Sequence, residues 1–289
     1  MNTVLITGST GLLGSSLIRL LDLEEAKVIT HAQNGIADFL ADLGDKSEVF
    51  DLLDYVQPDI LINLVGLTNV DLCESEPNSA YLVNTKIVEN ITDWINESKS
   101  PCHLVQISTD QLYDGAGPHI EAEVTLTNFY AFSKYAGELI ASKVPSTILR
   151  TNFFGFSHCQ HRQSFTDWVY HSILNDVNIK VFEDVKFSPL SMKTMAEMIQ
   201  LIIQRKPIGI FNLGSRNGIS KADFAFAFAE EIGLPSNNLQ RSTTDKSTIL
   251  KAYRPKDMRM NCTKFEGTFK LMLPELRDEI KKATKEYHD

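Results

Sequence analysis

Thr3-Val-Leu-Ile-Thr-Gly8-Ser-Thr-Gly11-Leu-Leu-Gly14 opens the chain and decides its fold. An apolar run suited to a buried parallel strand breaks at Gly8, and apolar residues at helical spacing continue to Leu21. A strand that turns on glycine into a helix directs free backbone N–H groups and the positive dipole end to one point, which suits a pyrophosphate. Because the glycine spacing is G-x-x-G-x-x-G and not G-x-G-x-x-G, a turn that binds no ligand remains the alternative.

The composition is that of an ordinary globular protein. The chain has 289 residues, 43% of them hydrophobic, enough for one large domain or a core domain with a smaller lobe. A net charge of −9 argues against nucleic acid and acidic membranes as partners, because no basic field recruits polyanions. The scattered Cys73, Cys102, Cys159 and Cys262 are typical of reduced thiols. With no cleavable leader or bilayer-spanning apolar run recognised, we expect a cytoplasmic protein without a membrane partner.

Short apolar runs alternate with amphipathic segments along the first half of the chain. We expect strands at 27–30, 39–43, 60–66, 103–109 and 146–150, and helices at 45–55 (capped by Asp45), 78–98 and 128–143. This alternation predicts an α/β fold with a doubly wound parallel sheet. Beyond Phe156 the rhythm loosens, with helices expected near 164–175, 191–204, 220–232 and from about 274, and strands near 179–182 and 210–213. The Phe224, Phe226 and Phe228 series is expected to be helical core behind a Ser220 cap.

Reactive side chains fall where open α/β folds bind their ligands, at the carboxyl ends of strands. Ser108 and Thr109 end one expected strand, and Tyr130 and Lys134 lie four residues apart on one face of an expected helix. An ammonium beside a phenol favours the phenolate, so Tyr130 can exchange a proton near neutral pH while Thr109 or Ser108 holds the substrate oxygen. Y-x-x-x-K alone arises by chance in many helices, but together with the glycine turn it indicates a catalytic set.

The end of the second strand bears on cofactor choice. In nicotinamide sites an acidic residue there binds the adenosine ribose 2′-hydroxyl and repels a 2′-phosphate. Here the place offers Thr30, His31, Gln33 and Asn34 without a carboxylate, which favours NADP(H) and leaves NAD(H) as the alternative. His31 is either a phosphate contact or an ordinary exposed loop histidine.

Taken together, these motifs resemble those of short-chain dehydrogenases/reductases of the extended type, and among them the dTDP-4-dehydrorhamnose reductase family. The matching stretches run nearly end to end: Thr7–Gly14, Ala41–Leu43, Pro58–Asn63, Thr68–Asp71 with Glu74–Pro77, Val83-Asn84, Ser108–Asp110 with Asp114-Gly115, Tyr130-x-x-x-Lys134 with Gly137-Glu138, Arg150-Thr151, and Arg254-Pro255 with Arg259. The resemblance implies a Rossmann-like dinucleotide-binding domain of residues 1–155 plus about 178–213, and a smaller C-terminal substrate-binding lobe of about 156–177 and 214–289.

The resemblance also implies a role for each matching residue. The cofactor would contact Gly8, Thr10, Gly11, Leu12, Leu13 and Gly14 with its pyrophosphate, Asp42 and Leu43 with its adenine, and Leu64, Val65 and Gly66 on the path to its nicotinamide. Thr109, Tyr130 and Lys134 would be catalytic, with Lys134 also on the nicotinamide ribose. The substrate would contact Thr68, Val70, Ser108, Asp110, Gln111, Asn152, Arg254 and Arg259.

The implied reaction reduces the C4 ketone of a nucleotide-linked 4-keto-6-deoxy sugar, with Tyr130 as proton donor, in deoxysugar and surface-polysaccharide biosynthesis. The implied partners are the nucleotide sugar and a second copy in a homodimer. The chain departs from the family at positions expected near the sugar, so the resemblance does not identify which sugar is the substrate. Gln111 replaces a usual tyrosine, Gly66 a usual alanine, and the segment Arg150–Gly155 has phenylalanines where tryptophan is frequent.

Two charged or ligand-rich loops have alternative interpretations. Arg254, Lys256 and Arg259 could pair with a diphosphate or form a solvated basic loop. The segment Ser157–Arg162 carries histidine and cysteine, but it lacks a fourth ligand and the usual spacings, so a surface loop is favoured and no metal site is expected.

Two other functions compete with the reductase. An epimerase or dehydratase of the same superfamily is one, although dehydratases tend to carry an Asp-Glu pair where this chain has Asp110-Gln111. The other is a non-catalytic regulatory role, because Leu234–Ser236, Arg254-Pro255 and Asn261–Lys264 resemble the regulatory beta subunit of methionine adenosyltransferase, which binds a nicotinamide cofactor.

Overall fold

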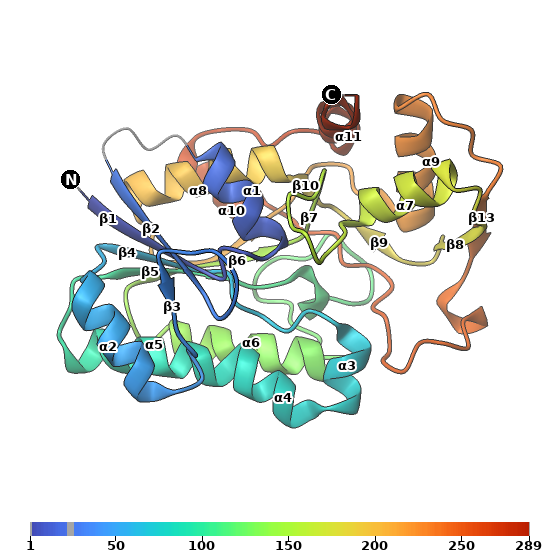
Figure 1. Cartoon of the computed structure of the whole chain (residues 1–289). Helices are drawn as coiled ribbons and strands as arrows, with labels where there is room; N and C mark the ends of the chain where they lie inside the picture. Colours follow the sequence, from blue (N-terminus) through green and yellow to red (C-terminus); the bar gives the residue numbers. More distant parts are fainter. Residues whose placement is uncertain (1, 22–25, 289) are drawn as a thin grey trace. The chain divides into compact units, whose positions relative to one another are not determined.

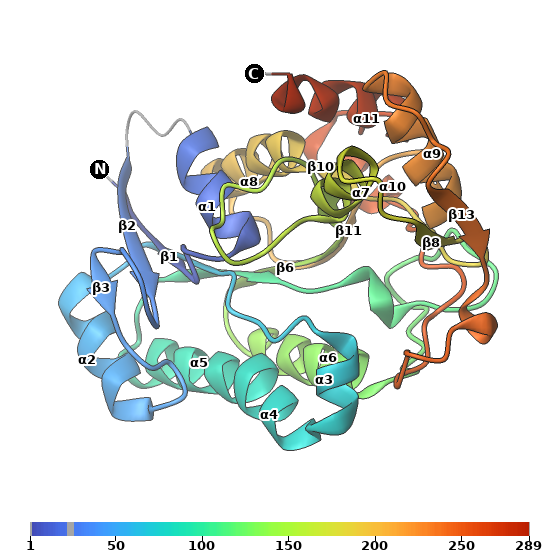
Figure 2. The same cartoon turned by 45° about the vertical axis from the view of Figure 1, so that its right-hand side comes forward.

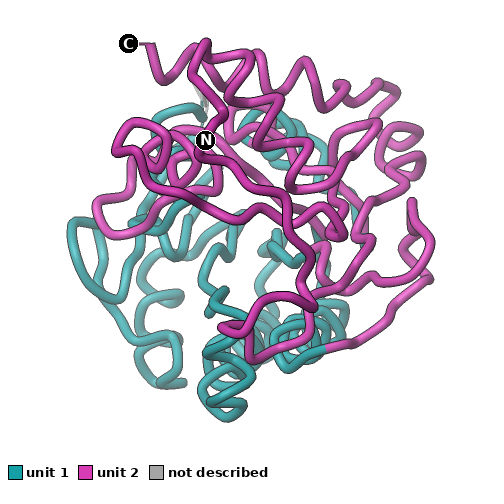
Figure 3. The backbone as a smooth tube through the Cα atoms, turned by 90° about the vertical axis from the view of Figure 1, so that its right-hand side faces the viewer, with its two compact units in different colours: residues 1–109, 128–149, 196–210 teal, residues 110–127, 150–195, 211–289 magenta. Residues whose placement is uncertain are grey.

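The structure is a computed structural model that describes residues 2–21 and 26–288. Its chain divides into two compact units, drawn in teal and magenta in Figure 3. Unit 1 comprises residues 1–109, 128–149 and 196–210, and unit 2 comprises residues 110–127, 150–195 and 211–289. These bounds differ from the expected lobes, because the segments 110–127, 150–155, 178–195 and 211–213 belong to unit 2.

A seven-stranded parallel sheet forms the centre of the fold (Figure 1). Its order is β11-β6-β5-β4-β1-β2-β3, and its strands are β1 (Asn2–Thr7), β2 (Ala26–Ala32), β3 (Phe39–Leu40), β4 (Ile60–Asn63), β5 (His103–Ile107), β6 (Ser146–Thr151) and β11 (Gly209–Leu213). The order reverses between β1 and β4, which is the switch point where such sheets bind ligands. The expected doubly wound α/β fold is thus confirmed.

Register brings the carboxyl ends of the inner strands to one edge. Thr7 pairs with both His31 and Asn63, and Asn63 pairs with Gln106. The residues that follow these four positions are the glycine turn, the loop after β2, the segment 64–70 and Ser108-Thr109. The sheet therefore gathers four stretches that are distant in sequence.

Helices cover both faces of this sheet in unit 1 (Figures 1 and 2). α1 (Leu12–Leu20) and α8 (Met192–Arg205) lie on one face, and α2 (Lys46–Val56), α5 (Ile87–Glu97) and α6 (Phe129–Ala141) lie on the other. The Asp45 carboxylate accepts from the N–H groups of Ser47 and Glu48, which confirms the expected cap of α2. Apolar side chains of β1, β4 and β5 and of the helices α2, α5 and α6 form a buried core around Trp94.

The segment expected as one helix over 78–98 is divided in three. The three parts are α4 (Pro77–Tyr81), a single π-helical turn η1 (Leu82–Lys86) and α5. A further short helix, α3 (Val70–Ser75), precedes them. The π turn inserts one residue into the helical ladder and directs Asn84 into the interior, where it is 2% exposed. Hydrophobic spacing did not reveal this bulge, because its flanking apolar residues keep a helical period.

Unit 2 is built from helices and short strand pairs. Its helices are α7 (Phe165–Leu174), α9 (Lys221–Glu231), α10 (Thr263–Phe269) and α11 (Leu276–Thr284), with short 3-10 turns at Asp110–Leu112, Thr244–Lys246 and Lys285–Tyr287. Its strand pairs are β7 (Phe153–Phe154) with β10 (Leu190–Ser191), β9 (Lys186–Phe187) with β12 (Ile219–Ser220), and β8 (Ile179–Phe182) with β13 (Leu239–Ser242).

The core of unit 2 is aromatic, and it confirms the expected role of the α9 phenylalanines. Phe224 and Phe228 are fully buried, and the Phe224 ring packs edge-on against Phe154 with centroids 4.7 Å apart. The Ser220 side chain accepts from the Asp223 N–H, so the expected cap is present. Across the described ranges, no helix combines the length and the apolar character needed to cross a bilayer.

Candidate active site

The glycine turn between β1 and α1 is shaped by three close approaches. Gly8 has φ +71, and a Cβ there would lie 3.1 Å from the Val65 nitrogen at the end of β4. A Cβ on Gly14 would lie 2.5 Å from the Gly8 carbonyl oxygen, and one on Gly11 3.2 Å from the same atom. Gly11 is also the N-cap of α1 and supplies no side-chain acceptor. The first N–H groups of α1, from Leu12 onward, therefore have no intrahelical partner and suit a pyrophosphate.

The end of β2 is more enclosed than the sequence suggested. His31 is 1% exposed, and its Nε2 lies 3.1 Å from the Ala41 carbonyl oxygen, so the exposed-loop interpretation is wrong. Burial lowers the pKa of His31, which leaves a neutral ring at pH 7. The nearby carboxylate of Asp38 accepts from the Thr30 N–H and hydroxyl at 2.8 Å each. Of the expected adenine contacts, Asp42 is exposed, whereas Leu43 is buried in the core.

The segment after β4 is organised by Asn84, which sequence reasoning placed in a matching stretch but not in the site. Its Oδ1 accepts from the Leu67 N–H at 2.8 Å, and its Nδ2 donates to the Leu67 carbonyl and to the Ser133 hydroxyl, each at 3.0 Å. A Cβ on Gly66 would lie 3.3 Å from Asn84 Oδ1 and 3.7 Å from Lys134 Nζ. Asn84 therefore fixes Leu67, and the preceding Gly66 lies close to both Asn84 and Lys134.

The other expected residues of this stretch differ in burial. Leu64 and Val65 are half-buried beside the glycine turn. Thr68 is exposed, and Val70 is buried at the start of α3. At the first turn, Thr10 is exposed and Leu13 is buried.

Tyr130 and Lys134 lie one turn apart on α6, which begins after the Asn128 cap. The Asn128 side chain accepts from the Ala131 N–H at 2.8 Å, so the helix starts just before the phenol. Lys134 Nζ donates to the Ile107 carbonyl at 2.7 Å, two residues before Thr109. The three expected catalytic residues thus belong to one buried region of unit 1, with exposed fractions of 4% for Thr109 and 6% for Tyr130 and Lys134.

Burial sets the proton affinity of Lys134. Desolvation lowers the pKa of Lys134 to about 8, and the carboxylate of Glu138 opposes this shift. The ammonium is therefore still largely protonated at pH 7, close to the point where it loses its proton.

Ser108 faces the helix and not the open end of the strand. Its hydroxyl donates to Glu138 Oε1 at 2.5 Å, and both residues are buried. Glu138 follows Lys134 by four residues on α6, and that spacing was the signal that could have identified it.

Unit 2 holds the remaining residues expected to contact substrate. Asp110 and Gln111 form the short turn that follows Thr109, and the Asn152 side chain donates to Asp110 Oδ2 at 2.8 Å. Asp110 is 1% exposed, while Asn152 is half-buried. The structure thus brings two expected substrate residues into direct contact.

The expected cations differ in how they are paired. Arg259 forms a salt bridge to Asp257 at 2.6 Å, and Lys256 forms one to Asp184 at 2.6 Å. Arg254 is half-buried, and one of its nitrogens donates to the Ala252 carbonyl at 3.0 Å.

Lys221, at the start of α9, was missed by sequence reasoning. Its Nζ lies 5.9 Å from the centre of the Phe165 ring and 5.8 Å from that of Phe187. Burial lowers the pKa of Lys221, with Asp110 opposing the shift and Arg254 adding to it. Within the described part of the chain, no side chain forms a salt bridge or hydrogen bond with its ammonium.

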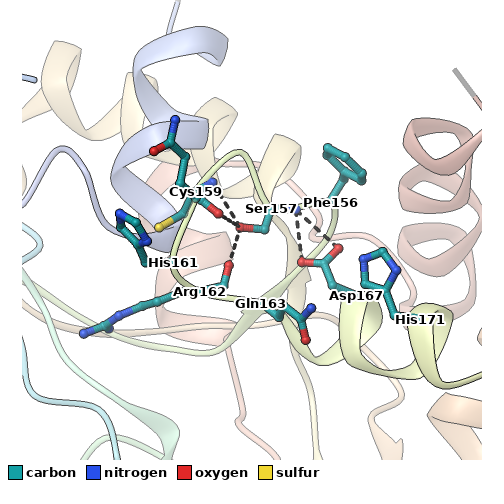
Figure 4. Close-up of a pocket in the computed structure, with 9 residues that line it drawn as sticks. Phe156, Ser157, Cys159, His161, Arg162, Gln163, Asp167 and His171 are labelled. Carbon is teal, nitrogen blue, oxygen red and sulfur yellow. Dashed lines mark hydrogen bonds between the residues drawn. The ribbon is translucent and has the colours of Figure 1, made fainter. Parts of the chain in front are cut away.

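The loop Ser157–Gln163 lines a cavity of about 510 Å³ in unit 2, together with Asp167 and His171 (Figure 4). Side-chain to backbone hydrogen bonds hold the loop: Ser157 Oγ donates to the Arg162 carbonyl at 2.7 Å, and the Asp167 carboxylate of α7 accepts from the Ser157 N–H at 3.2 Å. Cys159 and His161 belong to no group of three metal-ligating side chains within residues 2–21 and 26–288.

Comparison with known proteins places the chain in a family. The family model described as the RmlD substrate binding domain matches residues 1–289. The spore coat polysaccharide biosynthesis protein SpsK of Bacillus subtilis is 28% identical, over 85% of this chain and 84% of its own. A dTDP-4-dehydrorhamnose reductase of Shigella flexneri is 27% identical, over 98% and 97%. The crystal structure of the dTDP-4-dehydrorhamnose reductase of Bacillus anthracis in complex with NADP shares the fold, with a TM-score of 0.89, 24% identity and 99% of each chain covered. Since the family model spans all 289 residues, the chain belongs to the family defined by the RmlD substrate binding domain.

Proposed function

We propose that this protein is an NADPH-dependent reductase that converts the C4 ketone of a nucleotide-linked 4-keto-6-deoxy sugar to an alcohol. The observation that carries the proposal is the buried pair Tyr130 and Lys134, anchored through Ile107 beside Thr109. Relatives that align over nearly the whole chain are named dTDP-4-dehydrorhamnose reductase, and SpsK is named for polysaccharide biosynthesis. Tyr130, Lys134 and Thr109 are the residue types that a carbonyl reduction needs.

The glycine turn fits the pyrophosphate of a dinucleotide. Gly8, Gly11 and Gly14 leave no room for side chains, and the start of α1 has no side-chain cap. The adenosine half lies at the end of β2, where a neutral His31 supplies no charge and the Asp38 carboxylate is hydrogen-bonded to Thr30. These two groups do not themselves favour a 2′-phosphate, and the Asp38 carboxylate stands where the sequence suggested none. We assign NADP(H) as the favoured cofactor because the similar Bacillus anthracis reductase structure is a complex with NADP, with NAD(H) as the second.

The chain's own residues then handle the proton. When bound, the reduced nicotinamide supplies the hydride that reaches the sugar C4. The Tyr130 hydroxyl gives its proton to the C4 oxygen, which becomes a hydroxyl group, and Thr109 orients that oxygen by hydrogen bonding. The Lys134 ammonium stabilises the Tyr130 phenolate that remains.

The nucleotide diphosphate requires cations, and unit 2 offers Lys221, Arg254, Lys256 and Arg259. Arg259 and Lys256 are paired with carboxylates, so they are weaker candidates. Arg254 and Lys221 interact electrostatically with each other in unit 2, and the Lys221 ammonium is desolvated over two aromatic rings. A diphosphate would relieve both the repulsion and the desolvation, so we assign its binding to Arg254 and Lys221.

The proposal is tested by NADPH oxidation with freshly generated dTDP-4-keto-6-deoxy sugar. We expect Tyr130→Phe to lose roughly 100- to 10,000-fold in turnover while its NADPH affinity, followed by fluorescence, stays unchanged. Tyr135→Phe, on the same helix and outside the site, is the matched control and keeps wild-type turnover.

Other outcomes point to the other functions. Tight NADPH binding with no turnover on any nucleotide keto-sugar supports a regulatory role, and epimerisation or loss of water without net NADPH consumption supports an epimerase or dehydratase. A cytoplasmic location and a homodimer belong to the same proposal, and sedimentation of the purified protein tests the latter.

A further inference from the structure

A stripe of three buried side chains runs along α6. Tyr130, Lys134 and Glu138 follow each other at intervals of four residues, with exposed fractions of 6%, 6% and 1%. Residues four apart occupy one face of a helix, so the three side chains project from the same face of α6. Its first two members are the proposed proton donor and the lysine beside it, whereas Glu138 has no part in the reaction as described so far.

The end of β5 runs beside this stripe and contacts it twice. The Ile107 carbonyl accepts from Lys134 Nζ at 2.7 Å, and the Ser108 hydroxyl donates to Glu138 Oε1 at 2.5 Å. Thr109, the next residue, is the proposed catalytic hydroxyl. Consecutive residues of the strand end thus hold consecutive members of the helix stripe.

The close approach of α6 to its neighbours leaves Glu138 little freedom. A Cβ on Gly137 would lie 2.5 Å from the Asn84 carbonyl oxygen, so the helix rests directly on the π turn η1 at this point. Glu138 is therefore held on one side by Ser108 and fixed in position by the backbone contact beside it. A carboxylate buried in this way normally has a charged or donating partner.

The charges around Lys134 leave Glu138 as its main anionic neighbour. The other titratable group that acts on Lys134 is the Cys73 thiol of α3, and burial raises the pKa of Cys73 to about 11, so it is neutral at pH 7. The Glu74 carboxylate of α3 accepts a hydrogen bond from the Phe129 N–H and is not among the charges that act on Lys134.

Lys86 and Tyr81, on elements packed against α6, are not among the charges that act on Lys134. Lys86 of η1 is bridged to Glu89 of α5 at 2.8 Å. Tyr81 of α4 acts on the pKa of Lys86 and not on that of Lys134. The carboxylate that balances the buried ammonium is thus that of Glu138.

We propose that Glu138 is a positioning residue, whose carboxylate, oriented by the Ser108 hydroxyl, keeps Lys134 protonated and directed at the end of β5 beside Tyr130. The effect of Glu138 on catalysis rests on the proposed function. Its effect on the protonation of Lys134 does not. The same inference assigns Ser108 a role inside the protein, in place of the substrate contact that the resemblance implied. Without the carboxylate, desolvation of Lys134 is unopposed, and the ammonium loses its proton at lower pH.

The direct test is the ionisation of Lys134 itself, which needs no substrate. In protein labelled with ¹³C at lysine Cε, the Lys134 signal is assigned by its loss in Lys134→Met, and its chemical shift is followed against pH. We expect Glu138→Gln, which keeps the volume and an acceptor for Ser108, to lower the Lys134 midpoint by about one pH unit or more. Glu89→Gln removes a carboxylate from a half-buried ion pair that does not act on Lys134, and it should leave the midpoint unchanged.

The catalytic readout follows the same shift. If the chain reduces nucleotide keto-sugars, the alkaline limb of kcat/KM moves to lower pH in Glu138→Gln by the amount seen in the lysine titration. If wild type reduces none, the proposed function fails while the titration still decides the role of Glu138.

Two further variants keep the inference falsifiable. Ser108→Ala retains the charge, so its midpoint should move less than that of Glu138→Gln. If the glutamine variant does not fold, Glu138→Asp is used, and its retained charge should leave the midpoint within about half a unit of wild type. An unchanged midpoint in folded Glu138→Gln, a shift in Ser108→Ala that equals it, or a drop of a full unit in Glu138→Asp would each overturn the inference.

Discussion

Acid sensitivity of unit 1 should depend on one histidine. His103 opens β5 and is 4% exposed, with its Nε2 2.8 Å from the Thr147 hydroxyl oxygen. The Thr147 hydroxyl donates its proton to the Pro207 carbonyl, so it can only accept from His103. The imidazole therefore carries its proton on Nε2, and a second proton would place an unpaired charge in the interior. Burial, aided by the nearby Lys206, lowers the pKa of His103 to about 4.

The size of the effect follows from linkage. The unfolded chain binds a proton at His103 near pH 6.5, and the native protein does so only near pH 4, a difference of 2.5 units. Between these values the unfolded state holds more protons, so stability falls as the pH falls. The full loss is about 3 kcal/mol, of which about 2 kcal/mol is reached at pH 5.

The assay compares wild type with His103→Gln, whose amide nitrogen can replace Nε2 as the donor to Thr147. Urea unfolding is followed by the fluorescence of Trp94, which is fully buried in unit 1, in a Trp168→Phe background. Between pH 7.5 and 5.0 we expect wild type to lose about 2 kcal/mol more of its free energy of unfolding than His103→Gln. All other groups titrate alike in both proteins, so a difference below about 0.5 kcal/mol would refute the reasoning.

Three other predictions concern the glycine turn, a helix cap and the diphosphate. Gly14→Ala should lower the free energy of unfolding by about 2 kcal/mol or more and weaken NADPH binding, because its Cβ meets the Gly8 carbonyl at 2.5 Å. Gly267→Ala is the control: a Cβ there meets nothing within 4 Å, so it should raise the free energy of unfolding in urea by up to about 1 kcal/mol. Ser220→Ala should cost about 1 kcal/mol by the same assay, and no loss would contradict the cap seen at α9. Lys221→Met should raise KM for the nucleotide sugar about tenfold without weakening NADPH binding or lowering stability, since the lost ammonium is desolvated and has no acceptor among the described residues; an unchanged KM would remove Lys221 from the substrate site.

Local sequence determined the class of fold and the ends of its main elements. Glycine at position 8 can adopt a positive φ, and the Asp45, Asn128 and Ser220 side chains cap helices through contacts only two or three residues away. Such interactions act within one turn of backbone, so they follow from neighbouring residues alone. The four-residue spacing of Tyr130 and Lys134 likewise implies that the two side chains share a helix face.

Only the tertiary structure decided burial and partners. It showed that His31 is enclosed, that Ser108 donates to Glu138, and that the Lys221 ammonium rests on aromatic rings contributed by other segments. It also divided the 78–98 segment at a π turn so that Asn84 could reach Leu67. These outcomes depend on residues tens of positions apart meeting in space, and proton affinities in particular are set by desolvation and neighbouring charge, which no local pattern of residues encodes.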